Sequence, residues 1–169
     1  TSPGVVSAFY AAVRAYTQPG EGVIIMTPVY YPFFGAIENA GRKIIRNPLL
    51  NRADDYTIDF KGLEHLCRKK ENKLIIFCSP HNPVGRVWTE EELARLADIV
   101  LRYDMIIVAD EIHHDLIMPG YEHKVFQTLS HAVAERTITC TSPSKTFNLA
   151  GLCTSNIIIK NEALRKKMS

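Results

Sequence analysis

The sequence predicts an α/β fold in which helices cover both faces of a mostly parallel sheet. Short runs that are apolar along their whole length alternate with amphipathic helical segments, and polar residues of unusual type follow several of the apolar runs. The 169 residues, 46% of them apolar, are enough for one sizeable core. We therefore expect a single three-layer α/β/α domain over residues 1–169.

The predicted helices follow from apolar residues at helical spacing and from capping residues at their ends. In chain order they cover residues 5–16, residues 31–40, a segment that opens at Asp59 or Phe60 and reaches Cys67, residues 90–101 after a capping box of Thr89 and Glu92, and a segment that begins after Asn161. The predicted strands cover residues 22–26, 43–46, 73–78, 105–109, 137–141 and 156–159. The first helix starts almost at once and the last stops after about two turns, so we expect a fragment of a longer protein.

The composition excludes several classes of function. The 20 basic and 18 acidic residues leave a formal net charge of +2, which provides no electrostatic case for binding nucleic acid or an anionic membrane. No apolar run is long enough to span a bilayer. The cysteines form no C-x-x-C pair, so we expect reduced, buried thiols in a cytoplasmic protein; they are Cys67, Cys78, Cys140 and Cys153.

Chemistry in such a sheet is expected at the carboxyl ends of the strands. The stretches that follow four of the predicted strands are Thr27-Pro-Val-Tyr-Tyr-Pro32, Ser79-Pro-His-Asn-Pro-Val-Gly85, Asp110-Glu-Ile-His-His-Asp115 and Ser142-Pro-Ser-Lys145. Each also has a structural interpretation. Asn-Pro is a common turn pair, an acid after a strand is often a helix N-cap, and aromatic residues at a strand end often belong to the core or its rim.

Lys145 is the residue that packing explains least. It lies just past a strand end among hydroxyl side chains, and no charged residue is found within several positions on either side. A lysine in such surroundings can act as an amine nucleophile, although a surface loop lysine is the alternative.

Taken together, these groups fit pyridoxal phosphate. This cofactor needs a lysine amine for an imine, a carboxylate at its pyridinium nitrogen, a donor to its phenolic oxygen, a ring on its face, and hydroxyl or backbone N–H groups at its phosphate. The residues that supply these are, in turn, Lys145, Asp110, Asn82, Tyr30, and Ser142 with the helix start at Gly4, Val5 and Val6.

Four ordered motifs resemble those of a known family. The motifs T-P-x-Y, S-P-x-N-P-x-G, D-E-I-H and S-x-S-K-T-F-N resemble the large domain of fold-type I, class I and II aminotransferases, which are pyridoxal-phosphate enzymes. The variant D-E-I-H-x-D, with V-W-T-x-E-E-L further upstream, is most similar to the MalY/PatB branch of cystathionine β-lyases. The resemblance implies a fold-type I large domain that lacks part of its N-terminal segment and its C-terminal small domain, and a homodimer that acts on a small amino-acid substrate.

The resemblance implies the same cofactor roles for the residues named above. His113, at a position where the family usually differs, is a further candidate for cofactor binding, with no strong role assigned to it. Aminotransferases of this type commonly have a tyrosine at the position of His113 and a phosphate-binding arginine at the position of Cys153. The arginine that binds the substrate carboxylate lies outside this chain. The implied activity is a β-lyase that cleaves the Cβ–S bond of cystathionine or cysteine conjugates and releases thiol, pyruvate and ammonia, with an aminotransferase as the alternative.

The same residues allow other interpretations. A metal site of Glu111, His113, His114 and Asp115 is disfavoured because adjacent residues on a turn cannot all converge on one ion, so we expect no metal. Ser142-x-x-Lys145 also matches penicillin-recognising acyltransferases, but their K-T-G motif is missing. A Rossmann module would need G-x-G-x-x-G after a strand, which this chain lacks. A non-catalytic degenerate homologue stays open.

Overall fold

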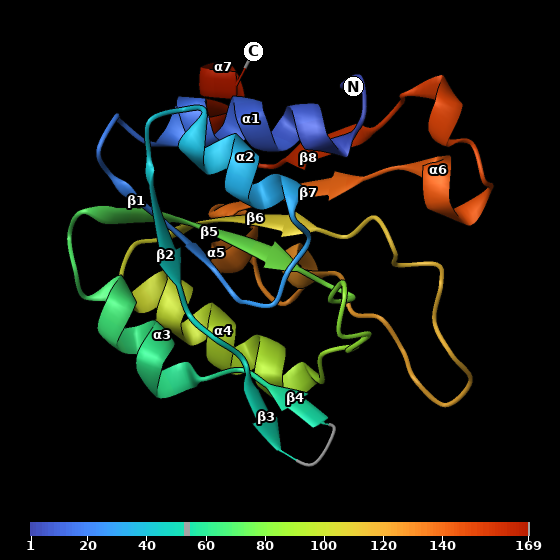
Figure 1. Ribbon diagram of the computed structural model, residues 1–169, viewed down its shortest axis with the longest axis horizontal. Coiled ribbons are helices and arrows are strands. Elements are labelled where there is room, and N and C mark those ends of the chain that lie inside the picture. The colour runs from blue at the N-terminus through green and yellow to red at the C-terminus, as the bar shows by residue number, and fades with distance from the viewer. Residues whose placement is uncertain (53–54, 169) are drawn as a thin grey trace.

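The computed structural model, which describes residues 1–52 and 55–168, contains a six-stranded sheet with the strand order β2-β1-β5-β6-β7-β8 (Figure 1). All neighbouring strands are parallel except β8, which runs antiparallel to β7. The strands are β1 Gly22–Ile25, β2 Lys43–Arg46, β5 Asn72–Cys78, β6 Ile106–Asp110, β7 Thr137–Thr141 and β8 Asn156–Ile159. The predicted mostly parallel sheet is therefore confirmed.

Helices cover both faces of this sheet, as Figure 1 shows. One face carries α1 Val5–Tyr16, α2 Pro32–Glu38 and α7 Glu162–Met168, and the other carries α3 Phe60–Cys67, α4 Glu90–Arg102 and α5 His131–Ala134. The one-turn helix α6 Pro143–Thr146 and the 3₁₀ turn η2 Ala150–Leu152 follow β7, and the 3₁₀ turn η1 Phe126–Thr128 precedes α5. The expected three layers are present.

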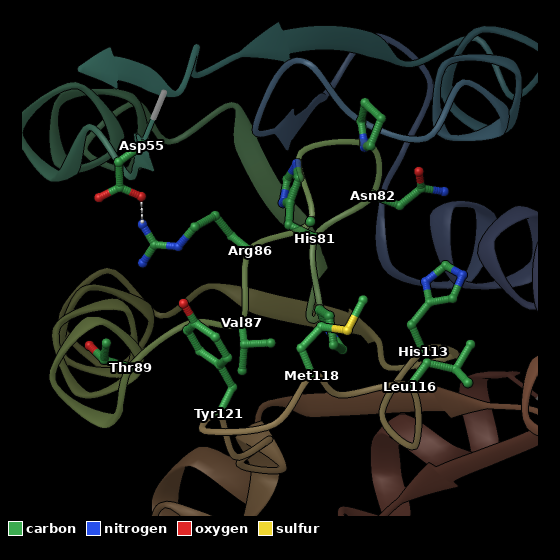
Figure 2. Close-up of a pocket in the computed structure, with 13 residues that line it drawn as sticks. Asp55, His81, Asn82, Arg86, Val87, Thr89, His113, Leu116, Met118 and Tyr121 are labelled. Carbon is green, nitrogen blue, oxygen red and sulfur yellow. Dashed lines mark hydrogen bonds and ion pairs between the residues drawn. The ribbon is translucent and has the colours of Figure 1, made fainter. Parts of the chain in front are cut away.

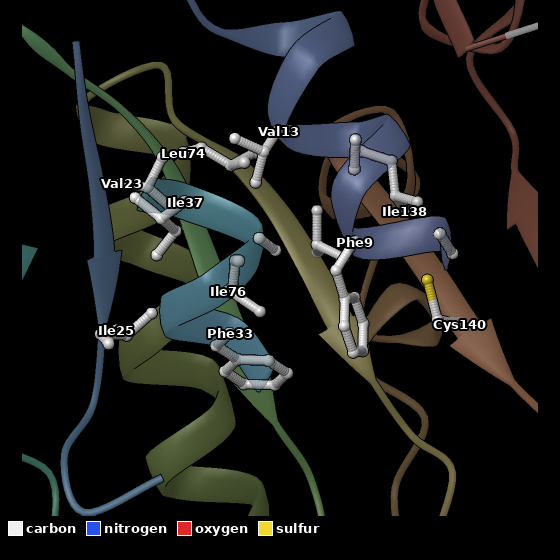
Figure 3. Packing of buried hydrophobic residues seen from close by; sticks show 14 of the residues in the cluster. Phe9, Val13, Val23, Ile25, Phe33, Ile37, Leu74, Ile76, Ile138 and Cys140 are labelled. Atoms are coloured by element: carbon white, nitrogen blue, oxygen red, sulfur yellow. The ribbon is translucent and has the colours of Figure 1, made fainter. Parts of the chain in front are cut away.

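Two hydrophobic cores explain why the strands are apolar on both sides. Side chains alternate along a strand, so Val23 and Ile25 of β1 pack against α1 and α2, whereas Ile24 between them joins the core under α3 and α4. Figure 3 shows the first core, in which Phe9 of α1 and Phe33 of α2 lie over the sheet. Their rings meet edge to face with centroids 4.9 Å apart.

The predicted helix starts are confirmed by their caps. Thr89 and Glu92 form a reciprocal capping box, in which Thr89 Oγ1 accepts from Glu92 N–H (3.2 Å) and Glu92 Oε2 accepts from Thr89 N–H (2.9 Å). Asp59 accepts from Gly62 N–H at 3.0 Å, and Asn161 accepts from Leu164 N–H at 3.0 Å. These contacts are local, which is why the sequence predicts them.

Several features differ from the sequence expectation. A two-stranded hairpin, β3 Leu50–Arg52 with β4 Asp55–Thr57, was not predicted, because two three-residue strands carry too little periodicity to detect. Helix α2 is shorter than residues 31–40, since the chain leaves the helix in a turn before Gly41. Cys153 is exposed, while the other three cysteines are buried as expected.

The place of Asp110 also corrects an alternative raised by the sequence. Asp110 is the last residue of β6 and pairs in register with Cys78 of β5 and Cys140 of β7. Residues 111–125 then form turns and irregular loop, so Asp110 caps no helix and the N-cap interpretation is wrong. None of the helices within residues 1–52 and 55–168 is long and apolar enough to cross a membrane.

Candidate active site

A cavity of about 240 Å³, here called the strand-end cavity, lies where β5, β6 and β7 end. Parallel strands deliver their carboxyl ends to one edge of the sheet, and in Figure 1 the first turn of α1 lies near that same edge. The lining includes every residue predicted for cofactor binding: Gly4, Val5, Val6, Tyr30, Asn82, Asp110, His113, Ser142 and Lys145. The lining residues that sequence reasoning did not assign are Phe9, Ile112, Ser144, Ala150, Cys153 and Thr154.

Asp110 is a buried carboxyl group with little to stabilise its charge. The residue is 3% exposed, and the hydrogen bond that its side chain accepts from Ile112 N–H is long, at 3.4 Å. Burial raises its pKa to about 7; the Ile112 bond and the charge of Lys145 oppose the shift, and the negative charge of Glu111 adds to it. A carboxylate in this state favours a cationic partner in the cavity.

Lys145 lies just past the end of β7, as the sequence predicted, but on the one-turn helix α6 and not on the surface loop that was the alternative. Ser142 is the N-cap of this one-turn helix, because Ser142 Oγ accepts from Ser144 N–H at 3.1 Å. The same hydroxyl donates to Thr154 O at 2.7 Å, so it holds the chain that returns from η2. Lys145 is exposed in this chain and lines the cavity, so both sequence interpretations describe part of its position.

The start of α1 forms the end of the cavity nearest Ser142. Gly4, its N-cap, has φ 87°, a conformation that strains any other residue, and no side chain caps the helix. Ser2 forms an antiparallel bridge with Ser155, with N–H to O distances of 3.1 and 3.0 Å, which ties the helix start to the segment after Lys145. Backbone N–H groups at such a helix start favour an anion.

Asn82 and Tyr30 complete the wall. Asn82 lies in a turn that is closed by hydrogen bonds from His81 N–H to Arg86 O (2.8 Å) and from Gly85 N–H to His81 O (2.7 Å). Its own N–H donates to Cys78 Sγ at 3.3 Å, which fixes the turn to the end of β5. The half-buried Tyr30 ring meets Phe33 edge to face, with centroids 6.0 Å apart.

A second, wider depression of about 860 Å³, here called the outer pocket, adjoins the strand-end cavity and shares Asn82 and His113 with it. Figure 2 shows these two residues on one side of the outer pocket, with Asp55 and Arg86 on the opposite side. Arg86 forms ion pairs with Asp55 and Glu92, both at 2.7 Å, so its charge is already neutralised. The exposed side chains of Leu116, Met118 and Tyr121 supply the apolar part of this surface.

The histidines and acids after β6 do not converge on one point, although His114 lies 3.4 Å from the carboxylate of Asp115. His113 lines the cavity, and burial, followed by the charge of Lys145, lowers its pKa, so that it is neutral near pH 7. Glu111 instead pairs with His123 at 3.0 Å, away from His113. No group of three or more His, Cys, Asp and Glu side chains that could hold a metal ion occurs within residues 1–52 and 55–168.

Ser144 is a lining residue that the sequence could have indicated, whereas Thr154 is not. Ser144 is the second serine of S-x-S-K, and sequence reasoning assigned a role to the first serine only. Thr154 is distant in sequence, and the hydrogen bond from Ser142 and the bridge between Ser155 and Ser2 hold it at the cavity. The acyltransferase interpretation loses support because Ser142 opens one helical turn beside a parallel sheet and donates its hydroxyl to a backbone carbonyl.

Comparison with known proteins agrees with this geometry. The chain is 46% identical over 168 residues to cystathionine β-lyase PatB of Bacillus subtilis (strain 168), with 99% of this chain and 43% of that protein covered. It is 34% identical over 163 residues to protein MalY of Escherichia coli (strain K12), with 96% and 41% covered. The crystal structure of cystalysin from Treponema denticola, which contains a pyridoxal 5'-phosphate cofactor, matches with a TM-score of 0.98 at 59% identity, with 99% of this chain and 42% of cystalysin covered.

The chain thus spans about two fifths of the length of these relatives. The sequence model for class I and II aminotransferases matches residues 1–169, which is every residue of the chain. Since the match is complete, and since the four motifs meet at one cavity of the fold, the chain belongs to the class I and II aminotransferase family.

Proposed function

We propose that this chain is the pyridoxal-phosphate-binding large domain, without its small domain, of a carbon–sulfur β-lyase acting on cystathionine or related cysteine conjugates. The observation that carries the proposal is the convergence of Lys145, Asp110 and Asn82 on one cavity from three different strand ends. The similarity to PatB, a cystathionine β-lyase, and to cystalysin, whose crystal structure contains pyridoxal 5'-phosphate, supports it.

The donor set of the strand-end cavity fits pyridoxal phosphate. Asp110 is a buried carboxylate with a weak hydrogen bond, and a protonated pyridine nitrogen would offer it both a proton and a positive charge. The Asn82 amide would donate to the phenolic oxygen, and Lys145 would hold the aldehyde carbon through Nζ. Tyr30 would cover one face of the ring, and the neutral His113 would lie at its edge.

The phosphate would lie between the start of α1 and the segment after Lys145. The sequence assigned Ser142 and the N–H groups of Gly4, Val5 and Val6 to the phosphate. Gly4 N–H donates to Ser2 O at 2.8 Å and the Ser142 hydroxyl donates to Thr154 O at 2.7 Å. The N–H groups of Val5 and Val6 and the hydroxyl of Ser144 would therefore be the donors to the phosphate. Cys153, at the position of the usual arginine, adds no positive charge. The phosphate charge would therefore be met by backbone dipoles, by hydroxyl groups or by a residue outside this chain.

When bound, pyridoxal phosphate supplies an aldehyde that bonds to amines and a ring that accepts the electron pair released at the substrate Cα. Asp110 would keep the proton on the ring nitrogen, which makes the ring a better acceptor. Once the substrate amine has taken its place at the aldehyde carbon, the freed amine of Lys145 would take the proton from the substrate Cα. The bond from Cβ to sulfur would then break, the thiol would leave, and hydrolysis would yield pyruvate and ammonia.

The family also contains aminotransferases, which makes transamination the second candidate. The same lysine, aspartate and asparagine would serve both reactions, so the residues of this chain do not separate them. A non-catalytic homologue would leave three such groups at one cavity without a use. The similarity to PatB favours the lyase.

Product analysis tests the proposal. We expect the full-length protein, loaded with pyridoxal phosphate, to release pyruvate and a thiol from cystathionine, measured by coupled reduction of pyruvate and by a thiol reagent. A keto acid that retains the cystathionine carbon chain, together with pyridoxamine phosphate, would make the protein an aminotransferase instead. A protein that binds no pyridoxal phosphate and forms neither product would be neither a lyase nor an aminotransferase of this kind.

One feature of the chain supports a homodimer, and another supports a cytoplasmic location. Phe147 and Leu152, which follow Lys145, are 66% and 67% exposed, and apolar surface of this kind is usually covered by a partner subunit or by other segments of the same protein. All four cysteines are unpaired, as is usual in a reducing compartment.

The chain as it stands should be a poor catalyst. The described residues that line the strand-end cavity include no arginine to bind a substrate carboxylate. We therefore expect the isolated 169-residue chain to bind pyridoxal phosphate weakly and to release no measurable pyruvate from cystathionine, because substrate orientation requires such an anchor. Release at the rate of the full-length protein would mean that these residues contain an anchor of their own.

A further inference from the structure

Glu111 is a second buried carboxylate directly beside Asp110, and nothing in the proposed chemistry uses it. Its side chain is 1% exposed and does not line the strand-end cavity; it contacts the backbone of Phe126, whose side chain belongs to the core under α3 and α4. Glu111 Oε2 pairs with Nε2 of His123, itself 7% exposed, at 3.0 Å, and Oε1 accepts from Phe126 N–H at 3.0 Å. A buried carboxylate persists only where such partners compensate its desolvation.

These contacts close a loop. Residues 112–125 contain neither helix nor strand, and the carboxylate of Glu111 binds the end of that loop at His123 and Phe126. At the other end, Glu111 O accepts from both N–H (3.1 Å) and Nδ1 (2.6 Å) of His114. Glu111 N–H also donates to Cys140 O at 2.9 Å, which continues the pairing of β6 with β7. One residue thus holds both ends of the loop to the sheet.

The loop carries part of both cavities. Ile112 and His113 line the strand-end cavity, and Leu116, Met118 and Tyr121 line the outer pocket. A loop without its own ladder of backbone hydrogen bonds depends on its closing contacts for a fixed position. The loop is also tied to α6, because Thr146 Oγ1 donates to Asp115 Oδ2 at 2.7 Å. The backbone that turns from Asp110 into His113 is therefore held at Glu111 and at Asp115, and only the contacts of Glu111 join the two ends of the loop.

We propose that Glu111 is a positioning residue, and that its carboxylate, paired with His123, clamps loop 112–125 and so keeps Asp110 and His113 in place in the strand-end cavity. The effect on the cofactor rests on the function proposed above. The clamp itself does not, because it is defined by contacts within the chain.

The test uses Glu111→Gln, which keeps the side-chain size and the bond from Phe126 N–H but removes the charge that faces His123. In the full-length holoprotein we expect chymotrypsin to cut the loop after Tyr121 at least tenfold faster, and the Kd for pyridoxal phosphate to rise at least tenfold. His123→Gln removes the other member of the pair and should raise the cleavage rate and the Kd by the same factors. It keeps the test valid if Glu111→Gln fails to fold. The double variant should show the same cleavage rate and the same Kd as Glu111→Gln alone, because the two substitutions remove the same contact.

Lys124→Ala is the matched control. Lys124 lies next to His123 in the same loop, but its ion pair with Glu90 is exposed, at 3.4 Å, so we expect cleavage and cofactor affinity to match the wild type. Wild-type cleavage in both clamp variants would overturn the clamp. Faster cleavage with unchanged cofactor affinity would overturn the link to the cavity. If the wild-type protein itself binds no pyridoxal phosphate, the proposed function fails, while the cleavage rates still decide the clamp.

Discussion

Replacement of Lys145 by alanine is expected to abolish the covalent link to pyridoxal phosphate and to reduce β-lyase turnover by at least about 10²–10⁴-fold, the range expected for loss of a general base. The fold should persist, because the Lys145 side chain is exposed and belongs to neither hydrophobic core. Borohydride reduction of the full-length holoprotein followed by mass spectrometry measures the link. Thermal unfolding measured by circular dichroism checks the fold.

Lys160→Ala serves as the control for this experiment. Lys160 is also exposed and follows β8, but it does not line the strand-end cavity. Its replacement should leave both the reduced cofactor adduct and turnover unchanged. A reduced adduct that persists in Lys145→Ala would assign the covalent link to another lysine and would remove the central residue of the proposed function.

The second large effect is expected for Asp110→Asn. Asparagine keeps the shape of the side chain but cannot stabilise a protonated ring nitrogen by charge, so elimination should fall by orders of magnitude while cofactor affinity falls less. Steady-state pyruvate release and equilibrium binding of pyridoxal phosphate by the full-length protein measure the two effects. The two measurements must be compared, because a loss of cofactor affinity without a loss of turnover in the loaded enzyme would indicate a merely structural role.

The same substitution has a consequence for stability without cofactor. The pKa of Asp110 is raised to about 7 in the folded chain and lies near 3.8 when unperturbed, so its contribution to stability is favourable at acid pH and is lost as the pH rises towards 7. Above pH 7 the buried charge should cost on the order of a few kcal/mol. Cofactor-free Asp110→Asn should therefore melt at a higher temperature than wild type at about pH 8, and the difference should shrink towards about pH 5.

Asp98→Asn is the matched change of charge, on the exposed side of α4 and away from the cavity. It should alter neither turnover nor the pH dependence of melting. Near-wild-type turnover of Asp110→Asn would show that this carboxylate is not the partner of the ring nitrogen. Identical melting curves at both pH values would show that Asp110 is not the buried charge that limits stability.

Much of the secondary structure could be predicted because its causes are local. Thr89 and Glu92 complete each other's hydrogen bonds within four residues, and Asp59 and Asn161 cap helices in the same way. The buried strands were evident because two helical layers require apolar residues on both strand faces. The hairpin of β3 and β4 was not predicted, because its short strands are defined by pairing with each other and not by a sequence pattern within either strand.

Residue type and order along the chain were enough to predict the fold class and the strand ends that carry polar residues. The cofactor roles rested also on the resemblance of four motifs to a known family, and the nine candidate residues all line one cavity. The folded sheet was needed to learn that Asp110 ends a strand instead of capping a helix, that Lys145 lies on a helical turn, and that Glu111 pairs with His123. The reason is physical: burial, register and pairing between distant segments arise only when the strands have assembled into a sheet.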